Sequence, residues 1–266
     1  MISAGDDMRR GVAETFRWRR RLGARLIGAP YCEIVADPAR PEVWDSNHAD
    51  AIVARGADEI GAVFTAMERH LAHSRWRVAH TDALTPDPFL ARLAFEDFCE
   101  RPLTIQMARE GRAAQARPLD LRPVESEAQW RELSALVRLN HGEGRTTGDL
   151  AMDAQTSAAM VAGYRAKHPH FRYRLAYEQG EAVAYGGCGA APNGFGVIED
   201  LFTRPDRRRR GIATAMIAAI IEELACGVVF LGALAAERPK RLYARLGFAP
   251  VALARVWVKD TLDSAR

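Results

Sequence analysis

The stretch from Glu199 to Ala213 constrains the fold of this chain more than any other part of its sequence. It starts as an apolar run that carries the acidic pair Glu199-Asp200, continues through four consecutive arginines, and ends in Gly211-Ile212-Ala213 before a long apolar segment. This pattern predicts a strand, a turn and a helix that begins at a glycine. Because the first turn of a helix presents unpaired N–H groups and the positive end of the helix dipole, the junction suits a phosphate-bearing ligand.

Around this junction, the C-terminal part of the chain alternates between strand and helix patterns. Alternating and apolar runs predict strands at residues 119–124, 171–177, 182–190, 197–203, 228–232 and 251–258. Apolar residues three or four positions apart predict helices at residues 126–139, 149–166, 211–225 and 237–246. The expected order is β-α-α-β-β-β-α-β-α-β, a mixed α/β (α+β) architecture with helices flanking a central sheet.

The N-terminal part has weaker patterns. Helices are expected at residues 7–22, 57–73 and 88–95, and strands at 31–35, 51–54, 77–80 and 103–107. The arginine-rich segment Arg17–Arg21 is expected to lie on a solvated amphipathic helix, with contact to nucleic acid or a membrane surface as the alternative. Residues 108–117, polar and rich in Ala and Arg, are the best linker, so we expect domains at residues 1–112 and 113–266.

A faint internal repeat relates the two parts. Leu90–Phe95 (LARLAF) resembles Tyr243–Phe248 (YARLGF), and Arg55-Gly56 precedes the first copy by about the same distance as Arg210-Gly211 precedes the second. Both copies are predicted as helix, strand, short helix and strand. Duplication explains this similarity, and chance similarity in a chain rich in Ala and Arg is the alternative.

Composition limits the classes of function. The chain is 48% hydrophobic and 27% charged, as is typical of a globular protein, and its net charge of +3 creates no global field for nucleic acid. Four scattered cysteines without a CxxC pair favour neither a zinc site nor a disulfide framework, which fits a cytoplasmic protein. Glu222-Glu223 interrupts the apolar segment 211–236, which favours a helix and a buried strand over a membrane span. We expect no nucleic acid, membrane or metal, and leave a homodimer open.

Two motifs in the C-terminal part occur together. The first is Arg208-x-x-Gly211-x-Ala213, and the second is Leu242-Tyr243-x-x-Leu246-Gly247-Phe248, with a predicted helix, strand and short helix between them. Together they resemble the phosphate-binding loop and the C-terminal signature of the GCN5-related N-acetyltransferase (GNAT) superfamily, which transfers an acyl group from acetyl-CoA to an amine. The resemblance implies the GNAT fold for this part, acetyl-CoA as cosubstrate, and a smaller, degenerate GNAT-like N-terminal half before it.

The expected cofactor site combines both lines of argument. Backbone N–H groups from about Arg209 to Thr214 are placed to hold a pyrophosphate, and flanking guanidiniums can add charge-assisted contacts. The resemblance implies that the strand splays before this loop and offers backbone groups to the pantetheine arm. The residues expected to bind acetyl-CoA are Leu201, Phe202, Thr203, Arg208, Arg209, Arg210, Gly211, Ile212, Ala213 and Thr214.

Two residues are expected to be catalytic. A protonated amine must lose a proton before it attacks, and Glu199 or Asp200 can accept that proton directly or through water. Because successive strand residues face opposite sides, only one of them is expected to face the cleft, and the resemblance favours Glu199. Tyr243 lies where many family members carry a tyrosine that protonates the departing thiolate. The alternatives are a carboxylate paired with a nearby arginine and a tyrosine that packs on Phe248 with its hydroxyl in solvent.

The expected activity is direct acetyl transfer, in a ternary complex, to a primary amine of a small molecule or peptide that the sequence does not identify. His141, Glu143 and Arg145 are candidate acceptor contacts because loops of this kind carry specificity. A non-catalytic acyl-CoA-binding or sensor protein is the alternative. The N-terminal copy has Asp58-Glu59 where a phosphate would lie, so that half is expected to have lost the cofactor site.

Overall fold

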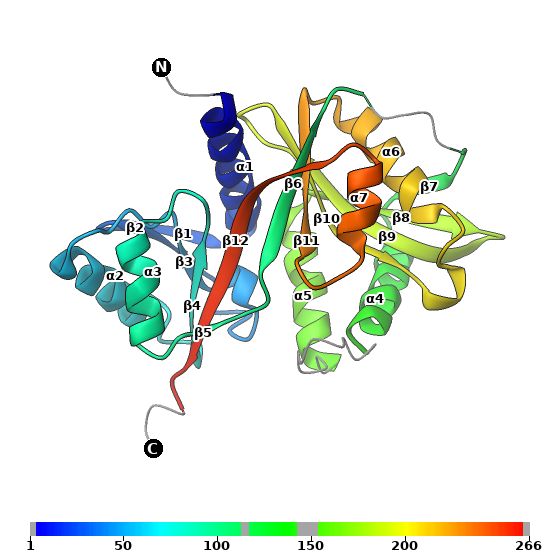
Figure 1. The fold of residues 1–266 in the computed structure, drawn as a ribbon. Helices are drawn as coiled ribbons and strands as arrows, with labels where there is room; N and C mark the ends of the chain where they lie inside the picture. The colour runs from blue at the N-terminus through cyan, green and yellow to red at the C-terminus, as the bar shows by residue number, and fades with distance from the viewer. Residues whose placement is uncertain (1–3, 113–116, 143–153, 263–266) are drawn as a thin grey trace. The chain divides into compact units, whose positions relative to one another are not determined.

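The computed structural model describes residues 4–112, 117–142 and 154–262 (Figure 1). The chain forms two compact units. Unit 1 comprises Met1–Gln106, Leu234–Ala236 and Val251–Arg266, and unit 2 comprises Met107–Ala233 and Glu237–Pro250. The last segment of the chain therefore belongs to the same unit as the first.

Unit 1 is built around a mixed sheet whose strands follow the order β1-β2-β3-β4-β12. Strands β3 and β4 are parallel, while the pairs β1–β2, β2–β3 and β4–β12 are antiparallel. Its elements are α1 (Ala4–Arg21), β1 (Arg25–Ala29), β2 (Cys32–Ala36), η1 (Trp44–Ser46), β3 (His48–Asp50), α2 (Ala57–His70), β4 (Trp76–Thr81), α3 (Asp87–Phe95), β5 (Cys99–Glu100), the start of β6 (Thr104–Glu110) and most of β12 (Ala249–Asp260).

The core of unit 1 forms because α2 and α3 are amphipathic. Ile60, Val63 and Met67 recur at helical spacing on α2, and Phe89 and Leu93 do so on α3, and all five side chains are buried in one cluster. Complete burial of a side chain of this size contributes about 1.5–3 kcal/mol. The packing of these two helices therefore holds them on the sheet.

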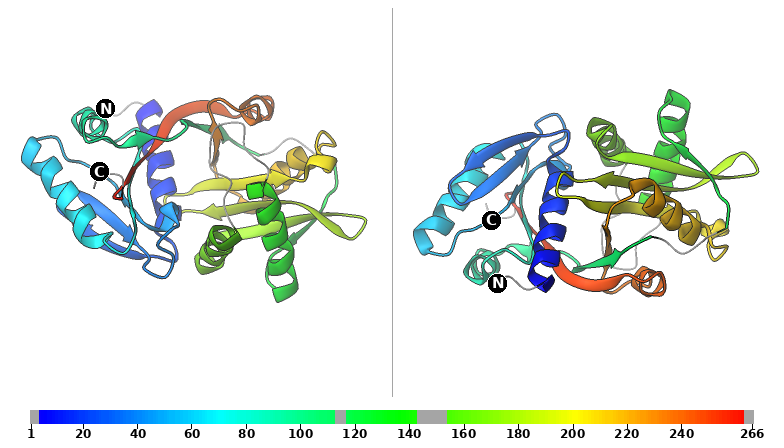
Figure 2. Two further views of the ribbon diagram at one scale, coloured as in Figure 1. Left: turned by 90° about the horizontal axis from the view of Figure 1, so that it is seen from below. Right: turned by 90° about the horizontal axis from the view of Figure 1, so that it is seen from above.

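Unit 2 contains the order β6-β11-β10-β9-β8-β7, in which β10 and β11 are parallel and the pairs β10–β9, β9–β8 and β8–β7 are antiparallel. Its further elements are β7 (Asp120–Pro123), α4 (Glu127–Gly142), α5 (Ala154–Lys167), β8 (Arg172–Glu178), β9 (Glu181–Ala190), β10 (Phe195–Thr203), η2 (Pro205–Arg207), α6 (Ile212–Leu224), β11 (Val228–Leu234) and α7 (Pro239–Arg245). Helices α4 and α5 cover one face of the sheet and α6 covers the other (Figure 2).

The predicted fold class and the predicted order of elements in the C-terminal part are confirmed. The N-terminal part differs in detail. The edge strand β1 carries no clear alternation and was not predicted. The strand expected at 51–54 is wrong: β3 ends at Asp50, because Ala51 has a φ of 50°. The segment expected as a linker starts as strand, since β6 continues to Glu110, and residues 113–116 lie outside the described residues.

The two units repeat one framework. In unit 1 a parallel strand pair is joined by a helix and followed by a short helix (β3-α2-β4-α3), and unit 2 repeats this as β10-α6-β11-α7. The last paired residues of the first strands are Ala49 and Ile198. Alignment on them matches Ala51 with Asp200, and both have positive φ, 50° and 56°. The similarity noticed in the sequence therefore extends to the backbone.

Candidate functional site

The junction between β10 and α6 leaves the start of the helix open. Gly211 is the N-cap residue with a φ of 79°, a conformation that glycine adopts without strain, and Ala215 N–H donates the first helical hydrogen bond to its carbonyl at 3.0 Å. Among the described residues no side chain caps this helix, and its first turn has no acidic residue. The N–H groups of residues 212–214 precede that first bond, so they and the helix dipole form an anion-binding position.

The arginines before the helix stabilise the loop as well as adding charge. Arg204 pairs with Glu181 and with Asp206, and Arg207 lies 3.5 Å from Glu181. Arg204 was not singled out in the sequence, because nothing near it indicates a partner on β9. These pairs fix the turn from which the helix starts.

The next three arginines differ in how they are held. Arg208 donates its Nε hydrogen to the Thr203 carbonyl at 3.0 Å, and Arg210 donates to the Asp206 carbonyl at 3.3 Å. Arg209 has a positive φ of 63° and an exposed side chain with no ion pair or side-chain hydrogen bond among the described residues. Of the three predicted phosphate-contacting arginines, Arg209 is therefore the most available.

Strand β10 leaves its parallel neighbour before it ends. Its pairing with β11 stops at Ile198 opposite Leu231, although β10 continues to Thr203. On its other side, pairing with β9 resumes at Phe202 after a bulge, because the register shifts between Glu199 and Phe202. The predicted pantetheine-binding segment, residues 201–203, lies in this part, where its backbone groups are not used by β11.

The bulge changes how the two carboxylates face. Glu199 is opposite Gly187, which is opposite Tyr173, so these three residues point to the same face of the sheet. Asp200 follows at a φ of 56°, yet its carboxylate accepts a hydrogen bond of 2.6 Å from the Tyr173 hydroxyl. Strict alternation, on which the expectation of a single cleft-facing carboxylate rested, does not hold across this bulge.

Tyr243 lies on α7 and is buried. Its ring packs edge-on against Phe248 at a centroid distance of 6.4 Å. Burial, followed by the charges of Glu237 and Glu199, raises the pKa of Tyr243 to about 12. The charge of the predicted base therefore acts on the predicted acid. The burial of Tyr243 does not support the alternative in which its hydroxyl lies in solvent.

The predicted acceptor loop is described only in part. His141 lies at the end of α4, and its Nδ1 is 2.9 Å from the Ser157 hydroxyl on α5. Glu143 and Arg145 lie outside the described residues. On the same face of the sheet, Asn140 donates to the Tyr185 hydroxyl at 3.0 Å, a contact that joins residues 45 positions apart and that no sequence pattern indicated.

In unit 1 the equivalent helix start is already capped. The Glu59 carboxylate accepts hydrogen bonds from the N–H groups of Arg55 at 2.7 Å and Gly56 at 3.1 Å. These bonds lower the pKa of Glu59. A carboxylate therefore already lies at the start of α2, whereas no side chain in the described part of unit 2 caps the start of α6.

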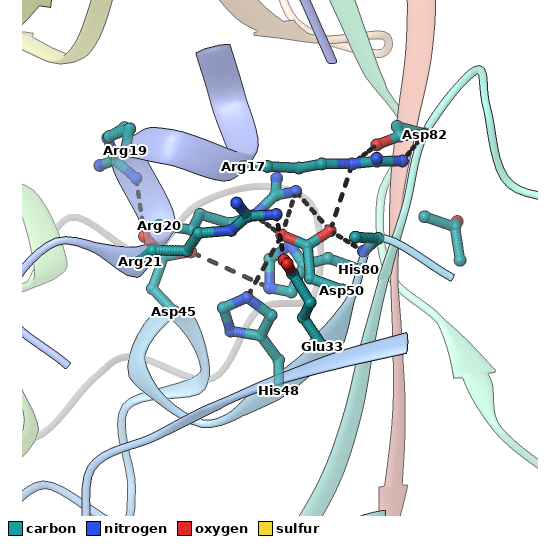
Figure 3. Close-up of polar contacts among 12 residues, drawn as sticks. Arg17, Arg19, Arg20, Arg21, Glu33, Asp45, His48, Asp50, His80 and Asp82 are labelled. Atoms are coloured by element: carbon teal, nitrogen blue, oxygen red, sulfur yellow. Dashed lines mark hydrogen bonds and ion pairs between the residues drawn. The ribbon is translucent and has the colours of Figure 1, made fainter. Parts of the chain in front are cut away.

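In unit 1 the residue that matches Glu199 is Asp50, and its carboxylate is already paired with an arginine (Figure 3). Asp50 is fully buried and accepts hydrogen bonds of 2.9–3.1 Å from Arg20 of α1, while Arg17 pairs with Asp82 at 2.8 Å. Burial alone would raise the pKa of Asp50, but the Arg20 guanidinium and the two nearby histidines outweigh it and hold that pKa well below its usual range. The expectation of a solvated arginine helix is wrong for Arg19 and Arg20, which are each 2% exposed.

Comparison with known families and structures decides the assignment. Residues 130–248 match the model of the Acetyltransferase (GNAT) family. This segment of unit 2 is a GNAT-family segment. The matched segment contains the β10–α6 junction, Glu199 and Tyr243, and lies within unit 2. A search of the curated proteins gives no match.

Solved structures extend the likeness to both units. A GCN5-related N-acetyltransferase from Kribbella flavida is 17% identical over 94% of each chain, with a TM-score of 0.69. A functionally unknown conserved protein from Staphylococcus epidermidis is 14% identical over 89% of this chain and 94% of that one, with a TM-score of 0.68. A tandem GNAT protein from the clavulanic acid biosynthesis pathway is 13% identical over 80% of this chain and 74% of that one, with a TM-score of 0.57. The predicted GNAT fold with a GNAT-like N-terminal half is confirmed.

Two further properties concern the cysteines and the apolar helices. All four cysteines are free thiols, of which Cys32 and Cys188 are buried. Within the described ranges, no helix combines the length and the apolarity that a membrane crossing requires.

Proposed function

We propose that unit 2 transfers an acetyl group from acetyl-CoA to a primary amine by direct attack in a ternary complex. One arrangement carries the proposal. Strand β10 leaves β11 after Ile198, and the helix that follows it starts at Gly211 without a side-chain cap. The charge of Glu199, on the same strand, acts on Tyr243. A cofactor cradle, a base and an acid thus belong to one unit. Unit 1 has the same framework with a capped helix and a filled carboxylate position.

Acetyl-CoA fits the residues at this junction. The N–H groups of residues 209–214 would hold the pyrophosphate, and the positive φ of Gly211 suits a tight loop whose backbone approaches phosphate closely. A Cβ at Gly211 would meet only the Arg117 side chain, at 3.7 Å, so the position is roomy and its preference for glycine is conformational. The backbone of residues 201–203 would bind the pantetheine arm as an additional strand.

Glu199 would prepare the amine. Alkylamines are mostly protonated at neutral pH, and only the neutral amine has a free electron pair. Glu199 takes one proton from the ammonium group, directly or through water, and the nitrogen then attacks the thioester carbonyl, whose activation is the chemistry that acetyl-CoA supplies. When the amide has formed, one proton remains on Glu199 and a second has moved from the nitrogen to the departing sulfur.

Tyr243 would donate a proton to the departing thiolate. Its pKa of about 12 keeps the hydroxyl protonated, but it exceeds the value of about 8.5 for a free thiol, so complete proton transfer to the thiolate is unfavourable at this pKa. Because the Glu199 charge is one cause of this raised pKa, protonation of Glu199 by the amine removes that contribution. Uptake of the amine proton thereby lowers the pKa of Tyr243, while burial and the charge of Glu237, its larger causes, continue to raise it.

Variants of these two residues test the proposal. In Glu199→Gln and Tyr243→Phe, kcat for the best amine in a panel scored by CoA release is expected to fall about 100-fold or more, while acetyl-CoA still raises the Tm of each protein. Tyr177→Phe is the matched control, since this buried tyrosine donates to Glu132 on α4. Acetyl-CoA binding without acetylation of any amine would instead support the sensor hypothesis, and no effect of acetyl-CoA on Tm would exclude both.

We also propose that the acceptor is a small molecule or a peptide, and that neither nucleic acid nor a membrane is a partner. The support is that loop arginines Arg204 and Arg207 are paired with carboxylates, which reduces the positive charge that a polyanion would meet. Binding to DNA that weakens steeply with salt would contradict this. Sedimentation would decide whether the protein is a homodimer.

A further inference from the structure

Asp200 lies beside the proposed base but is held differently from it. Its carboxylate accepts the Tyr173 hydroxyl hydrogen at 2.6 Å, from a residue 27 positions earlier on β8. Tyr173 is only 2% exposed, so its hydroxyl is placed by the core of unit 2 rather than by solvent. A buried side chain thus reaches across the sheet to orient one carboxylate.

The ring of Tyr173 is fixed on several sides. It stacks on Tyr164 of α5 at a centroid distance of 4.5 Å and meets Phe171 edge-on at 5.6 Å. Gly187, opposite Tyr173 on β9, has no room for a side chain, because a Cβ there would lie 2.4 Å from Phe171 and 3.0 Å from Tyr173. The absence of a side chain at this position therefore lets the aromatic rings cross the strand beneath the carboxylates.

The backbone at Asp200 does not require an aspartate. Its counterpart in unit 1, Ala51, adopts nearly the same positive φ with a methyl side chain. The positive φ is therefore a property of the framework, and the side chain at Asp200 needs an explanation of its own. That explanation is in its contacts: a fixed carboxylate next to Glu199, above a group of aromatic rings.

Resting on the proposed function, we propose that Asp200, positioned by Tyr173, anchors the acceptor as an ammonium cation while Glu199 removes its proton. The two adjacent carboxylates have different roles: the anchor, Asp200, must keep its charge and orientation, whereas the base, Glu199, must change its charge when it accepts the proton. The substrate class that follows is aliphatic amines, which carry a positive charge at neutral pH. Aromatic amines, which are neutral at that pH, gain nothing from such an anchor.

Two isomeric probes separate these classes. Benzylamine and 4-methylaniline have the same molecular formula, but at pH 7.5 benzylamine is protonated and 4-methylaniline is neutral. For Asp200→Asn, the KM for benzylamine is expected to rise about 10- to 100-fold, the loss typical of a charged hydrogen-bonded contact. The KM for acetyl-CoA and the KM for 4-methylaniline are expected to stay within twofold of those of the unchanged protein. Asparagine tolerates positive φ, so the bulge is retained.

A double-mutant cycle tests the positioning role of Tyr173. Tyr173→Phe is expected to raise the KM for benzylamine less than Asp200→Asn does, with little change in kcat, and the double variant is expected to be no worse than Asp200→Asn alone. Tyr177→Phe, on the same strand, is the control expected to leave both KM values unchanged. A merely structural role for Tyr173 would instead lower kcat and change the KM for acetyl-CoA as well.

Different experimental results would refute the anchor proposal and the proposed function. Acetylation of benzylamine with an unchanged KM in Asp200→Asn, or faster turnover of 4-methylaniline than of benzylamine, would overturn the anchor and leave the proposed function standing. Failure of the unchanged protein to acetylate any amine would overturn the proposed function and the anchor together.

Discussion

His80 in unit 1 gives a quantitative test of the buried cluster drawn in Figure 3. The side chain lies on β4, is 6% exposed as a residue, and its ring lies 4.4 Å from the ring of His48. Burial is the main cause that holds the pKa of His80 well below its usual value of 6.5; the charges of His48 and Arg20 act in the same direction, and those of Asp45 and Asp50 oppose them. The folded protein therefore keeps His80 neutral at mildly acidic pH.

The size and sign of the effect follow from proton linkage. Below pH 6.5 the unfolded chain binds a proton at His80 that the folded protein does not bind, so folding becomes less favourable as pH falls. Between pH 7.5 and pH 5.5 this single site shifts the unfolding equilibrium about tenfold, or about 1.4 kcal/mol. The contribution to stability is fully present above the unfolded pKa of about 6.5 and decreases below it.

The assay is urea unfolding at pH 7.5, 6.5 and 5.5, followed by tryptophan fluorescence. Four of the five tryptophans lie in unit 1, and Trp130 is in unit 2, so a Trp130→Phe background makes the signal report on unit 1. In His80→Gln, the loss of unfolding free energy between pH 7.5 and pH 5.5 should be smaller by about 1.4 kcal/mol than in the background protein. His70→Gln, which removes a histidine on α2 outside this cluster, is the control.

The test compares how the free energy of unfolding changes with pH, rather than its absolute value, because His80→Gln also changes packing. An equal pH slope in the two proteins would mean that folded His80 is protonated as readily as in the unfolded chain. That result would refute the argument that burial keeps the ring neutral.

Three further predictions concern packing and backbone. Gly187→Ala should destabilise unit 2 by about 1–3 kcal/mol through overpacking against Phe171, measured by urea unfolding, and an unchanged stability would contradict the tight contact. Asp50→Asn should cost about 3–5 kcal/mol in unit 1, because Arg20 keeps a buried charge without its partner, and a loss below 1 kcal/mol would show that the charge is solvated. Gly211→Ala should cost about 1–2 kcal/mol in unit 2, because its φ is positive, and should weaken acetyl-CoA binding in calorimetry; unchanged affinity would place the phosphates elsewhere.

Much of unit 2 could be predicted from local sequence. The helices and strands from residue 119 to 258 follow apolar periodicity, and glycine marks the start of α6, so the order of elements and the open helix start were both accessible. The two motifs that carry the family resemblance lie within the segment that matches the GNAT family model. The β10 bulge was not accessible, because a register shift depends on how β9 pairs beside it.

The neighbours of charged groups were accessible only in part. The capping role of Glu59 is local, and the sequence placed this acidic residue where a phosphate would lie. The arginine run of α1, in contrast, looked solvated, because its partners Asp50 and Asp82 are 30 and 65 positions away from Arg20 and Arg17. Burial of an arginine is favourable only with such a partner, and no pattern within the helix reveals one.

The sequence by itself determined the order of helices and strands in the C-terminal part, where α6 starts without a cap, and which family that part resembles. These properties depend on residues a few positions apart, which periodicity and glycine placement report directly. Only the tertiary structure decided that strand β12 pairs with β4 of unit 1, that Arg20 neutralises Asp50, and that Tyr173 orients Asp200. Each of these contacts joins distant segments, and its free energy exists only once the whole fold brings them together and excludes water from between them.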